Sequence, residues 1–342
     1  MTYLDHAATT PMHPAALEAM VAELGRTGNA SSLHGPGRAA RRTLEESRES
    51  LAAGLGARPN DVVLTSGGTE ADNLAITGLY WARRTADPRR RRVVVSGVEH
   101  HAVLDPARRL EQHGAEIVVL PVDAEGVVDL AALAAELDRH AEEIALISVM
   151  WANNEIGTIQ PVPAVVAAAR EHGIPVHADA VQAVAHLDVD FAASGLDAMT
   201  VSGHKIGGPV GIGLLLVRRG LAVQPVLHGG GQERGLRPGT LDVPAARAFA
   251  VALERAVADR PVEAPRLSAL RDRLLAGVLD QVSDAVVRGP RGAARLPANA
   301  HLTFPGCEAD SLIYLLDSAG IACSTGSACQ AGVQQPSHVL LA

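Results

Sequence analysis

The sequence contains almost no lysine. Of its 30 Lys and Arg residues, Lys205 alone is a lysine. An arginine guanidinium stays protonated and cannot form an imine, whereas a lysine amine can lose its proton and attack an aldehyde. A general bias toward arginine could leave one lysine by chance. Alternatively, a primary amine is kept for covalent chemistry, and the residues around Lys205 favour this second interpretation.

Cysteine and long apolar runs are also scarce. The three cysteines are too few and too clustered for a disulfide framework and lack the CxxC spacing of a metal site, so we expect reduced thiols and no metal. No apolar run reaches the length of a membrane span, and the N-terminal segment has neither the basic head nor the apolar stretch of a signal peptide. We therefore expect a cytoplasmic protein without membrane contact.

The chain has an excess of negative charge. Its formal net charge is −8 at pH 7, which argues against direct nucleic-acid binding. Hydrophobic residues make up 47% and charged residues 20% of the 342 residues, which is typical of a globular protein with a large core. At this length we expect a large domain with a smaller one attached.

Short apolar runs alternate with helical patterns through the middle of the chain. The runs are rich in Val, Ile and Leu, as strands buried on both faces are. The candidate strands are residues 62–65, 93–96, 116–120, 145–150, 176–178, 198–202 and 211–217. The helix candidates between them are residues 69–86, 102–113, 130–139 and 163–172. This pattern predicts an α/β fold, a mainly parallel seven-stranded sheet with helices on both faces.

The ends of this block depart from the alternation. The loop around Lys205 is too short for a helical crossover, so the last two strands can pair antiparallel. A helix candidate at residues 37–55 precedes the first strand. Two more, at residues 243–259 and 264–282, are followed by an α+β stretch. We predict a large domain at residues 15–240 and a small domain at residues 1–14 and 241–342.

A glycine pair follows the first strand. Gly67 and Gly68 allow a tight turn with exposed backbone amides, and Thr69 begins a helix whose free N–H groups and dipole favour an anion. A phosphate fits this position, with the Thr69 hydroxyl as an added donor. A purely structural turn before a helix accounts for the same residues, so this motif is weak alone.

Ionisable side chains follow two later strands. Asp179 and Lys205 are both expected at the edge where strands end, because ligands of open α/β sheets bind there. Asp179 can hold a pyridine nitrogen protonated or, more simply, cap the following turn. Ser202 and His204 can donate to a phosphate. A phosphate cradle, an acid for a ring nitrogen and an amine for an aldehyde together indicate pyridoxal 5′-phosphate (PLP), held by Lys205 as a Schiff base.

Further polar residues are expected at the same edge. His100 can stack on a cofactor ring and move protons near neutral pH, or it can cap a helix. Asn153 or Asn154 can bond a ring hydroxyl or a substrate, although asparagines after a strand are ordinary turn residues.

The cysteines are expected in different surroundings. Cys329 lies in a small, polar, glycine-containing loop and is exposed enough to react. We expect Cys323 to be buried at a strand end and Cys307 to lie at the edge of the core.

Together these motifs closely resemble the cysteine desulfurases of the NifS/IscS type, PLP enzymes of aminotransferase fold type I, class V. The resemblance extends from Tyr3 to the C-terminus. It rests on YLDHAATTP (3–11), NASSLH (29–34), SGGTE (66–70), EH (99–100), NNEIG (153–157), HAD (177–179), GHK (203–205), GGGQER (229–234), RPGT (237–240) and GSAC (326–329).

The resemblance implies a role for each candidate residue. Lys205 binds PLP covalently and moves protons on the substrate, Asp179 pairs with the pyridine nitrogen, and His100 stacks on the ring and assists proton transfer. The other cofactor-binding residues implied are Asn154 and Gln182 at the ring hydroxyl or substrate, and Gly68, Thr69, Ser202 and His204 around the phosphate.

The resemblance also implies partners and a reaction. Thr240 would reach the phosphate of the neighbouring subunit, so a homodimer is expected. L-Cysteine would be converted to L-alanine, with its sulfur left as a persulfide on the nucleophile Cys329. The Cys329 loop is similar to that of the longer-loop subgroup, which delivers sulfur to iron–sulfur cluster scaffolds and tRNA-thiolating enzymes.

Two departures from the family pattern stand out. Pro238 stands where the family more often has Ser. The sequence ends at Ala342, before the strand whose arginine clamps the substrate carboxylate in the family, so we expect a truncated sequence. Three alternatives stay open: a selenocysteine lyase, an ordinary aminotransferase, and an inactive PLP-binding partner in sulfur trafficking.

Overall fold

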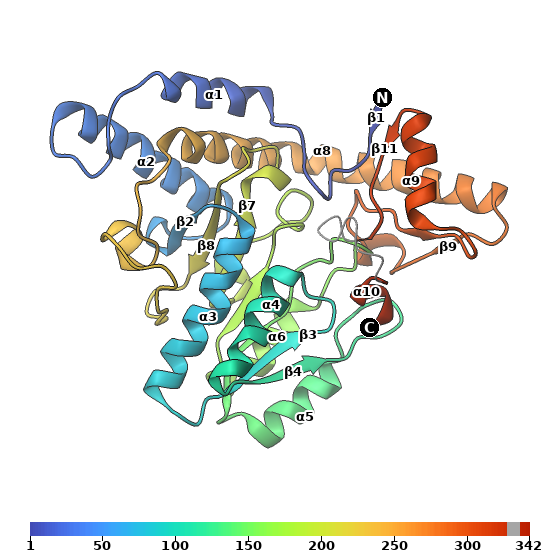
Figure 1. Cartoon of the computed structure of the whole chain (residues 1–342), viewed down its shortest axis with the longest axis horizontal. Coiled ribbons are helices and arrows are strands. Elements are labelled where there is room, and N and C mark those ends of the chain that lie inside the picture. The colour runs from blue at the N-terminus through green and yellow to red at the C-terminus, as the bar shows by residue number, and fades with distance from the viewer. Residues whose placement is uncertain (327–335) are drawn as a thin grey trace.

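The computed structural model describes residues 1–326 and 336–342. It is built around a central sheet (Figure 1), which has seven strands. The strand order is β2-β8-β7-β6-β5-β3-β4. Neighbouring strands are parallel, except that β8 runs antiparallel to both β2 and β7. The prediction of a mainly parallel sheet is confirmed. The strands are β2 (Val62–Thr65), β3 (Arg92–Ser96), β4 (Glu116–Leu120), β5 (Ile144–Ser148), β6 (Val176–Asp179), β7 (Ala198–Ser202) and β8 (Gly213–Val217).

Helices cover both faces of the sheet, as predicted. Successive strand residues point to opposite faces, so continuously apolar strands fill two cores. Val63 and Val93 belong to the core under α3 and α4, whereas Val62 and Val94 belong to the core under α2, α5 and α6. These helices are α2 (Gly35–Gly54), α3 (Gly68–Ala86), α4 (His101–Leu110), α5 (Leu130–His140) and α6 (Val162–Arg170).

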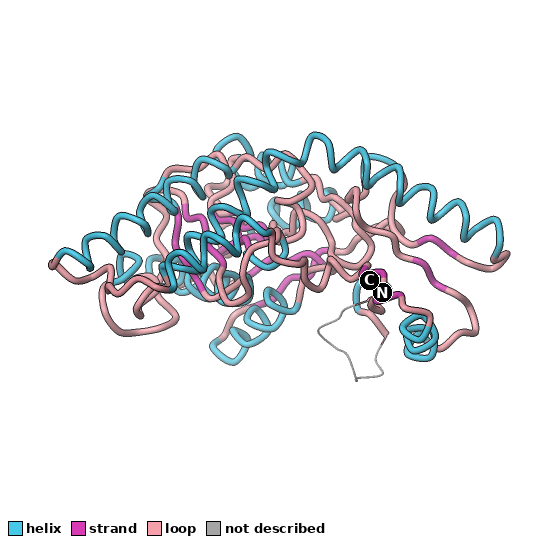
Figure 2. Tube along the Cα trace, turned by 90° about the horizontal axis from the view of Figure 1, so that it is seen from above, coloured by secondary structure: helices cyan, strands magenta, loops and turns pink. Residues whose placement is uncertain are grey.

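A single helix, α8 (Val243–Gln281), corrects the prediction of two helices at residues 243–259 and 264–282. Pro261 and Pro265 lie inside it, and both are at least partly exposed. The carbonyl groups that lose a proline partner can therefore bond water, and the helix continues. It runs from beside α1 and α2 to the region of β9 (Figure 1, Figure 2).

The two ends of the chain meet in short strands. β1 (Thr2–Tyr3) pairs in parallel with β11 (Ile321–Ala322), and β9 (Val286–Val287) pairs antiparallel with β10 (Leu302–Thr303). Helix α1, which the sequence analysis missed, begins at Pro14 and is capped by His13, whose Nδ1 accepts the Ala15 amide at 3.1 Å. The remaining helices are α1 (Pro14–Leu24), α7 (Phe191–Ser194), α9 (Ala309–Ser318) and α10 (His338–Leu341). None of the described helices is both long and apolar enough to span a membrane.

A buried ion pair ties the loop after β8 to the core. Arg48 donates to the two carboxylate oxygens of Glu233 at 2.9 and 2.6 Å, and the Leu64 amide donates to Glu233 at 2.7 Å. Both charged residues are at most 7% exposed. Without Glu233, the buried Arg48 guanidinium would keep a longer pair with the partly exposed Glu45 at 3.3 Å, which leaves most of its charge uncompensated.

Glu233→Gln is therefore expected to lower the free energy of unfolding by about 3–5 kcal/mol. Urea denaturation measures this change. The matched control is Glu263→Gln, which breaks an exposed pair with Arg266 in α8 and should leave the urea midpoint almost unchanged. An equal midpoint shift in both variants would contradict the role assigned to Glu233.

Candidate active site

The predicted site residues meet at one edge of the sheet. Strands β2, β3, β5, β6 and β7 run in the same direction, so the segments that follow them leave at the same edge. These segments and strand ends carry Thr69, His100, Asn154, Asp179 and Lys205, in the order of the strands named.

The turn between β2 and α3 has a backbone geometry that suits an anion. Gly67 has a φ of +154°, which side chains rarely tolerate. A Cβ at Gly68 would lie 3.1 Å from Val181 Cγ2 and 3.5 Å from Ser202 Cβ, so the start of α3 closely approaches the end of β7. The first amides of a helix lack intrahelical partners. Together with the exposed Thr69 they can receive a phosphate.

The N-terminal segment lies against the lysine. Lys205 Nζ donates to the carbonyl oxygens of Ala7 and Ala8 at 2.5 and 2.8 Å, and Gln182 Nε2 donates to Ala7 at 2.9 Å. His204 Nδ1 lies 3.2 Å from Thr9 Oγ1. These contacts place the Lys205 amine against the N-terminal segment. Sequence reasoning used this segment as a motif but gave it no role.

Asp179 and His100 each combine two roles. Asp179 Oδ1 accepts the Val181 amide at 2.9 Å, which is the turn-capping role considered above. Burial raises the pKa of Asp179, while the nearby charges of His100 and Lys205 lower it. His100 Nδ1 accepts the Ala102 amide at 3.1 Å and so caps α4. Asp179 and His100 thus cap a turn and a helix. The charges of His100 and Lys205 still act on the Asp179 carboxyl group, so these caps are compatible with a chemical role.

The two candidate asparagines are distinguished by their contacts. Asn153 is fully buried: it donates to the Val98 carbonyl at 3.0 Å and accepts the amides of Glu155 and Ile156. It is a turn residue. Asn154 is half-buried and stays the candidate for a cofactor or substrate contact.

Sequence reasoning missed a group of buried ionisable residues beside Asp179. Asp72 in α3, Glu99 after β3 and His177 in β6 are all at most 1% exposed. His177 Nδ1 lies 2.9 Å from Ser148 Oγ, and its Nε2 lies 3.0 Å from Thr200 Oγ1. Burial lowers the pKa of His177 to about 3, so its imidazole is neutral at pH 7.

Glu99 has no cationic partner at its carboxyl group among the described residues. Its Oε1 accepts the Met150 amide at 2.6 Å, and its Oε2 is buried without a hydrogen bond in the described part of the chain. Burial raises the pKa of Glu99 to about 8, and the charge of Asp179 adds to the rise. His338 contacts the backbone carbonyl of Glu99 and not its carboxyl group.

Glu99→Gln is expected to raise stability at alkaline pH. The folded protein keeps a proton on Glu99 up to about pH 8, whereas an unfolded glutamate releases it near its ordinary pKa of 4.5. The contribution of Glu99 to stability is thus complete below pH 4.5 and is lost as the pH rises through 8. Relative to the natural protein, the variant should gain roughly 2–4 kcal/mol between about pH 5 and about pH 9. Urea midpoints at both pH values measure the gain, and a pH-independent difference would contradict it.

The cysteines lie in different surroundings. Cys329 is outside the described residues. Cys323 follows β11 and is half-buried, and burial, with a further effect of Asp5, raises its pKa. Cys307 is exposed, which corrects the expectation that it lies at the core edge. It follows β10 in a turn ahead of α9.

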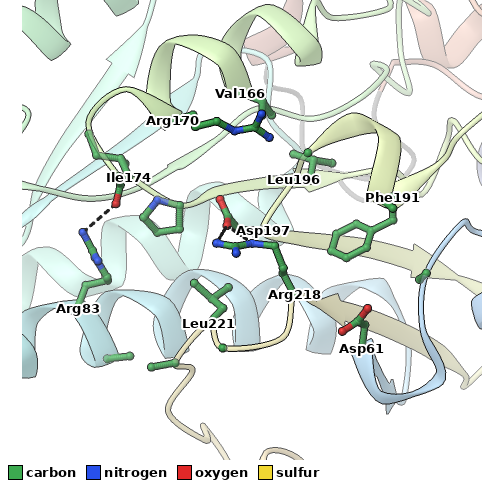
Figure 3. A pocket seen from close by; sticks show the side chains of 18 of the residues that line it. Asp61, Arg83, Val166, Arg170, Ile174, Phe191, Leu196, Asp197, Arg218 and Leu221 are labelled. Atoms are coloured by element: carbon green, nitrogen blue, oxygen red, sulfur yellow. Dashed lines mark hydrogen bonds and ion pairs between the residues drawn. The ribbon is translucent and has the colours of Figure 1, made fainter.

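A cavity of about 990 Å³ lies at the opposite edge of the sheet (Figure 3). It is lined by segments that precede β6 and β7 and follow β8, including Ile174, Leu196 and Arg218. Arg218 forms an ion pair of 2.5 Å with Asp197 there. None of the predicted site residues within residues 1–326 and 336–342 lines this cavity. No cluster of three or more potential metal ligands occurs in residues 1–326 and 336–342.

The residues at the carboxyl edge fit PLP. The glycine turn closely approaches Ser202 and would hold its phosphate. Asp179 is buried, and the Val181 amide is the donor that holds its Oδ1. Such a carboxylate suits a protonated pyridine nitrogen. Lys205 supplies the amine.

Comparisons with known proteins identify the family of the chain. The family model "Aminotransferase class-V" matches residues 2–342. The "IscS-like cysteine desulfurase" of Mycobacterium tuberculosis is 57% identical over 343 residues, covering 100% of this chain and 87% of that protein. A solved "NifS-like protein" has a TM-score of 0.89 and 34% identity, with 99% and 88% of the two chains covered. The structure "SspA in complex with cysteine" has a TM-score of 0.85 and 32% identity, with 100% and 94% covered.

A sheet of this order with an amine, a carboxyl group and a phosphate cradle at one edge defines a PLP-dependent enzyme of fold type I, and the chain belongs to the class V aminotransferase family. Within that family it is a member of the cysteine desulfurases of the IscS and NifS type.

Proposed function

We propose that this protein converts L-cysteine to L-alanine and transfers the sulfur to Cys329 as a persulfide. The observation that carries the proposal is the position of Lys205, which meets Asp179 and the glycine cradle at one sheet edge. Bound PLP would supply an electron sink for the carbanion formed when the substrate loses its Cα proton.

The chain's own residues would hold the cofactor and move protons. Lys205 would bond the cofactor covalently and exchange a proton with the substrate Cα, and Asp179 would hold the ring nitrogen protonated. His100 would stack on the ring and assist proton transfer. The further contacts we propose are Asn154 and Gln182 at the ring hydroxyl or substrate, and Gly68, Thr69, Ser202 and His204 at the phosphate.

The sulfur transfer balances without an external oxidant. The Cys329 thiolate attacks the substrate sulfur, an S–S bond forms and the Cβ–S bond breaks. The Cβ carbon is reduced to the methyl group of alanine and takes up a proton, while the thiol of Cys329 is oxidised to a persulfide. We propose cytoplasmic delivery of this sulfur to an iron–sulfur scaffold or a tRNA-thiolating enzyme.

Peptide mass spectrometry after addition of L-cysteine tests the proposal. We expect one added sulfur on Cys329, with alanine formed in step. A keto acid as the product would indicate an aminotransferase instead. PLP binding without added sulfur would favour the inactive trafficking partner, and faster turnover of selenocysteine without need for Cys329 would favour a selenocysteine lyase.

We also propose a homodimer in which Thr240 completes the partner's site, and a division into residues 15–240 and residues 1–14 with 241–342. The parallel pairing of β1 with β11 supports the division. Thr240 is exposed in a single protomer. Mixing Lys205→Ala and Thr240→Ala subunits tests the dimer. If Thr240 acts across the interface, each mixed dimer regains one intact site; if it acts within its own subunit, no site is intact.

A further inference from the structure

Three carboxyl groups are buried together at the carboxyl edge of the sheet. Asp72, Glu99 and Asp179 are 1%, 0% and 6% exposed. The charge of Asp179 raises the pKa of both others, so the three groups interact electrostatically. Of the three, Asp179 is the one whose pKa is lowered by His100 and Lys205. The cationic groups of the site therefore favour a charge on Asp179.

Asp72 in α3 lies beside polar side chains of β6 and β7. Its Oδ1 lies 3.5 Å from His177 Nε2 but makes no hydrogen bond within the described residues. Thr200 Oγ1 lies 3.0 Å from the same nitrogen, and Thr200 pairs with Asp179 in the sheet register. His177 and Asp179 are two residues apart in a strand, so their side chains share one face.

The neighbours of Asp72 do not neutralise a negative charge. His177 is neutral, because burial lowers its pKa far below 7. The Thr200 hydroxyl is a dipole whose hydrogen bond lowers the pKa of Asp72, but burial and the charge of Asp179 act in the opposite direction and prevail. Glu99 adds further repulsion. A charge on Asp72 in addition to the one on Asp179 would have no cationic neighbour of its own within the described residues, which is costly in a buried site.

We propose that Asp72 is a positioning residue: as a neutral carboxylic acid beside Thr200 and His177, it keeps the single negative charge of this cluster on Asp179, where it faces the cofactor ring. Glu99 is the second neutral member. In this arrangement Asp72 and Glu99 are protonated and Asp179 carries the negative charge. This inference rests on the proposed role of Asp179 toward the pyridine nitrogen.

Isotope-edited infrared spectroscopy of the purified holoenzyme at about pH 7.5 counts protonated carboxyl groups directly. Asp72→Asn and Glu99→Gln are each expected to remove one carbonyl band of a buried protonated acid. The matched control is Asp61→Asn, because Asp61 is a buried aspartate paired with Arg58 at 3.0 Å and should contribute no such band. Unchanged bands in Asp72→Asn would overturn the proposal.

A second pair of variants separates positioning from packing. Asp72→Asn mimics the neutral acid and should keep the cofactor affinity within about threefold, whereas Asp72→Leu leaves Thr200 and His177 without a polar neighbour and should weaken it about tenfold. The absorption maximum of the bound cofactor should shift in the leucine variant and not in the asparagine variant. Equal affinities and equal spectra in the two variants would overturn the proposal.

Two further results cover the remaining cases. If Asp72→Asn does not fold, Thr200→Val can be used, because it leaves the carboxyl groups of Asp72 and Glu99 in place. This variant should shift the infrared band of Asp72 without removing it. An unshifted band would contradict the proposed contact between Asp72 and Thr200. If Asp179→Asn left cofactor affinity unchanged, the proposed role of Asp179 would fail while the infrared result for Asp72 would still stand.

Discussion

Lys205→Ala is expected to abolish covalent attachment of PLP and to lower the rate of alanine formation by about a thousandfold or more. The amine of Lys205 lies at the sheet edge that carries Asp179 and the glycine cradle, and no other lysine exists in the chain. An arginine cannot replace it, because a guanidinium stays protonated and forms no imine. The folded protein should persist, since two backbone carbonyls that accept hydrogen bonds from the Lys205 amine belong to the N-terminal segment, outside the core.

Borohydride reduction followed by peptide mass spectrometry measures the covalent bond. The natural protein should carry the cofactor mass on the Lys205 peptide after reduction, and the variant should carry it nowhere. The control Lys205→Arg keeps the positive charge and the contacts to Ala7 and Ala8, so it separates charge from imine chemistry. If Lys205→Arg retained the reduced adduct, or if Lys205→Ala kept the visible spectrum of the natural protein, the assignment of this site would be wrong.

The central sheet was predictable from the sequence because its strands are buried on both faces. Continuous apolar runs such as Val93–Val95 are typical of buried strands when they alternate with helical patterns. The carboxyl ends of β6 and β7 followed from the same pattern to within one residue, and with them the edge at which Asp179 and Lys205 meet. The strand predicted at residues 145–150 ends at Ser148 instead.

The break predicted in α8 shows where local rules fail. A proline inside a helix removes one hydrogen bond, but an exposed carbonyl finds water instead, so tertiary packing decides whether the helix continues. The contact of Ala7 and Ala8 with Lys205 could not be predicted from local sequence patterns either. It joins residues almost two hundred positions apart, and two alanines carry no chemical signal of their own.

The buried carboxyl groups did leave a signal. In α3, Asp72 lies three and seven residues before Ala75 and Leu79, and all three are fully or almost fully buried. A charged residue on the apolar stripe of a helix is rarely buried unless it has a partner or a function. Its partners, His177 and Thr200, come from β6 and β7, and their proximity follows from the strand order and not from any spacing in the sequence.

Cys329→Ala is expected to keep the cofactor and lose the sulfur product. The groups that we assign to PLP come from the sheet edge and the start of α3, whereas Cys329 belongs to the segment between β11 and α10. Substrate binding and removal of the Cα proton therefore do not need the thiol. Without a thiolate to attack the substrate sulfur, alanine formation should fall by about a hundredfold or more.

The experiment compares three cysteine variants by absorption spectrum, alanine yield and peptide mass. Cys307→Ala and Cys323→Ala are the matched controls. Cys307 is exposed and lies in a turn. Cys323 is half-buried near Asp5, and its raised pKa leaves less of it as the nucleophilic thiolate. Both controls should form alanine and carry added sulfur on Cys329, while Cys329→Ala keeps the spectrum and forms neither. If Cys323→Ala instead were the variant that lost the persulfide, the nucleophile would be Cys323; if Cys329→Ala lost the cofactor spectrum, sulfur capture and cofactor binding would share groups that we have assigned separately.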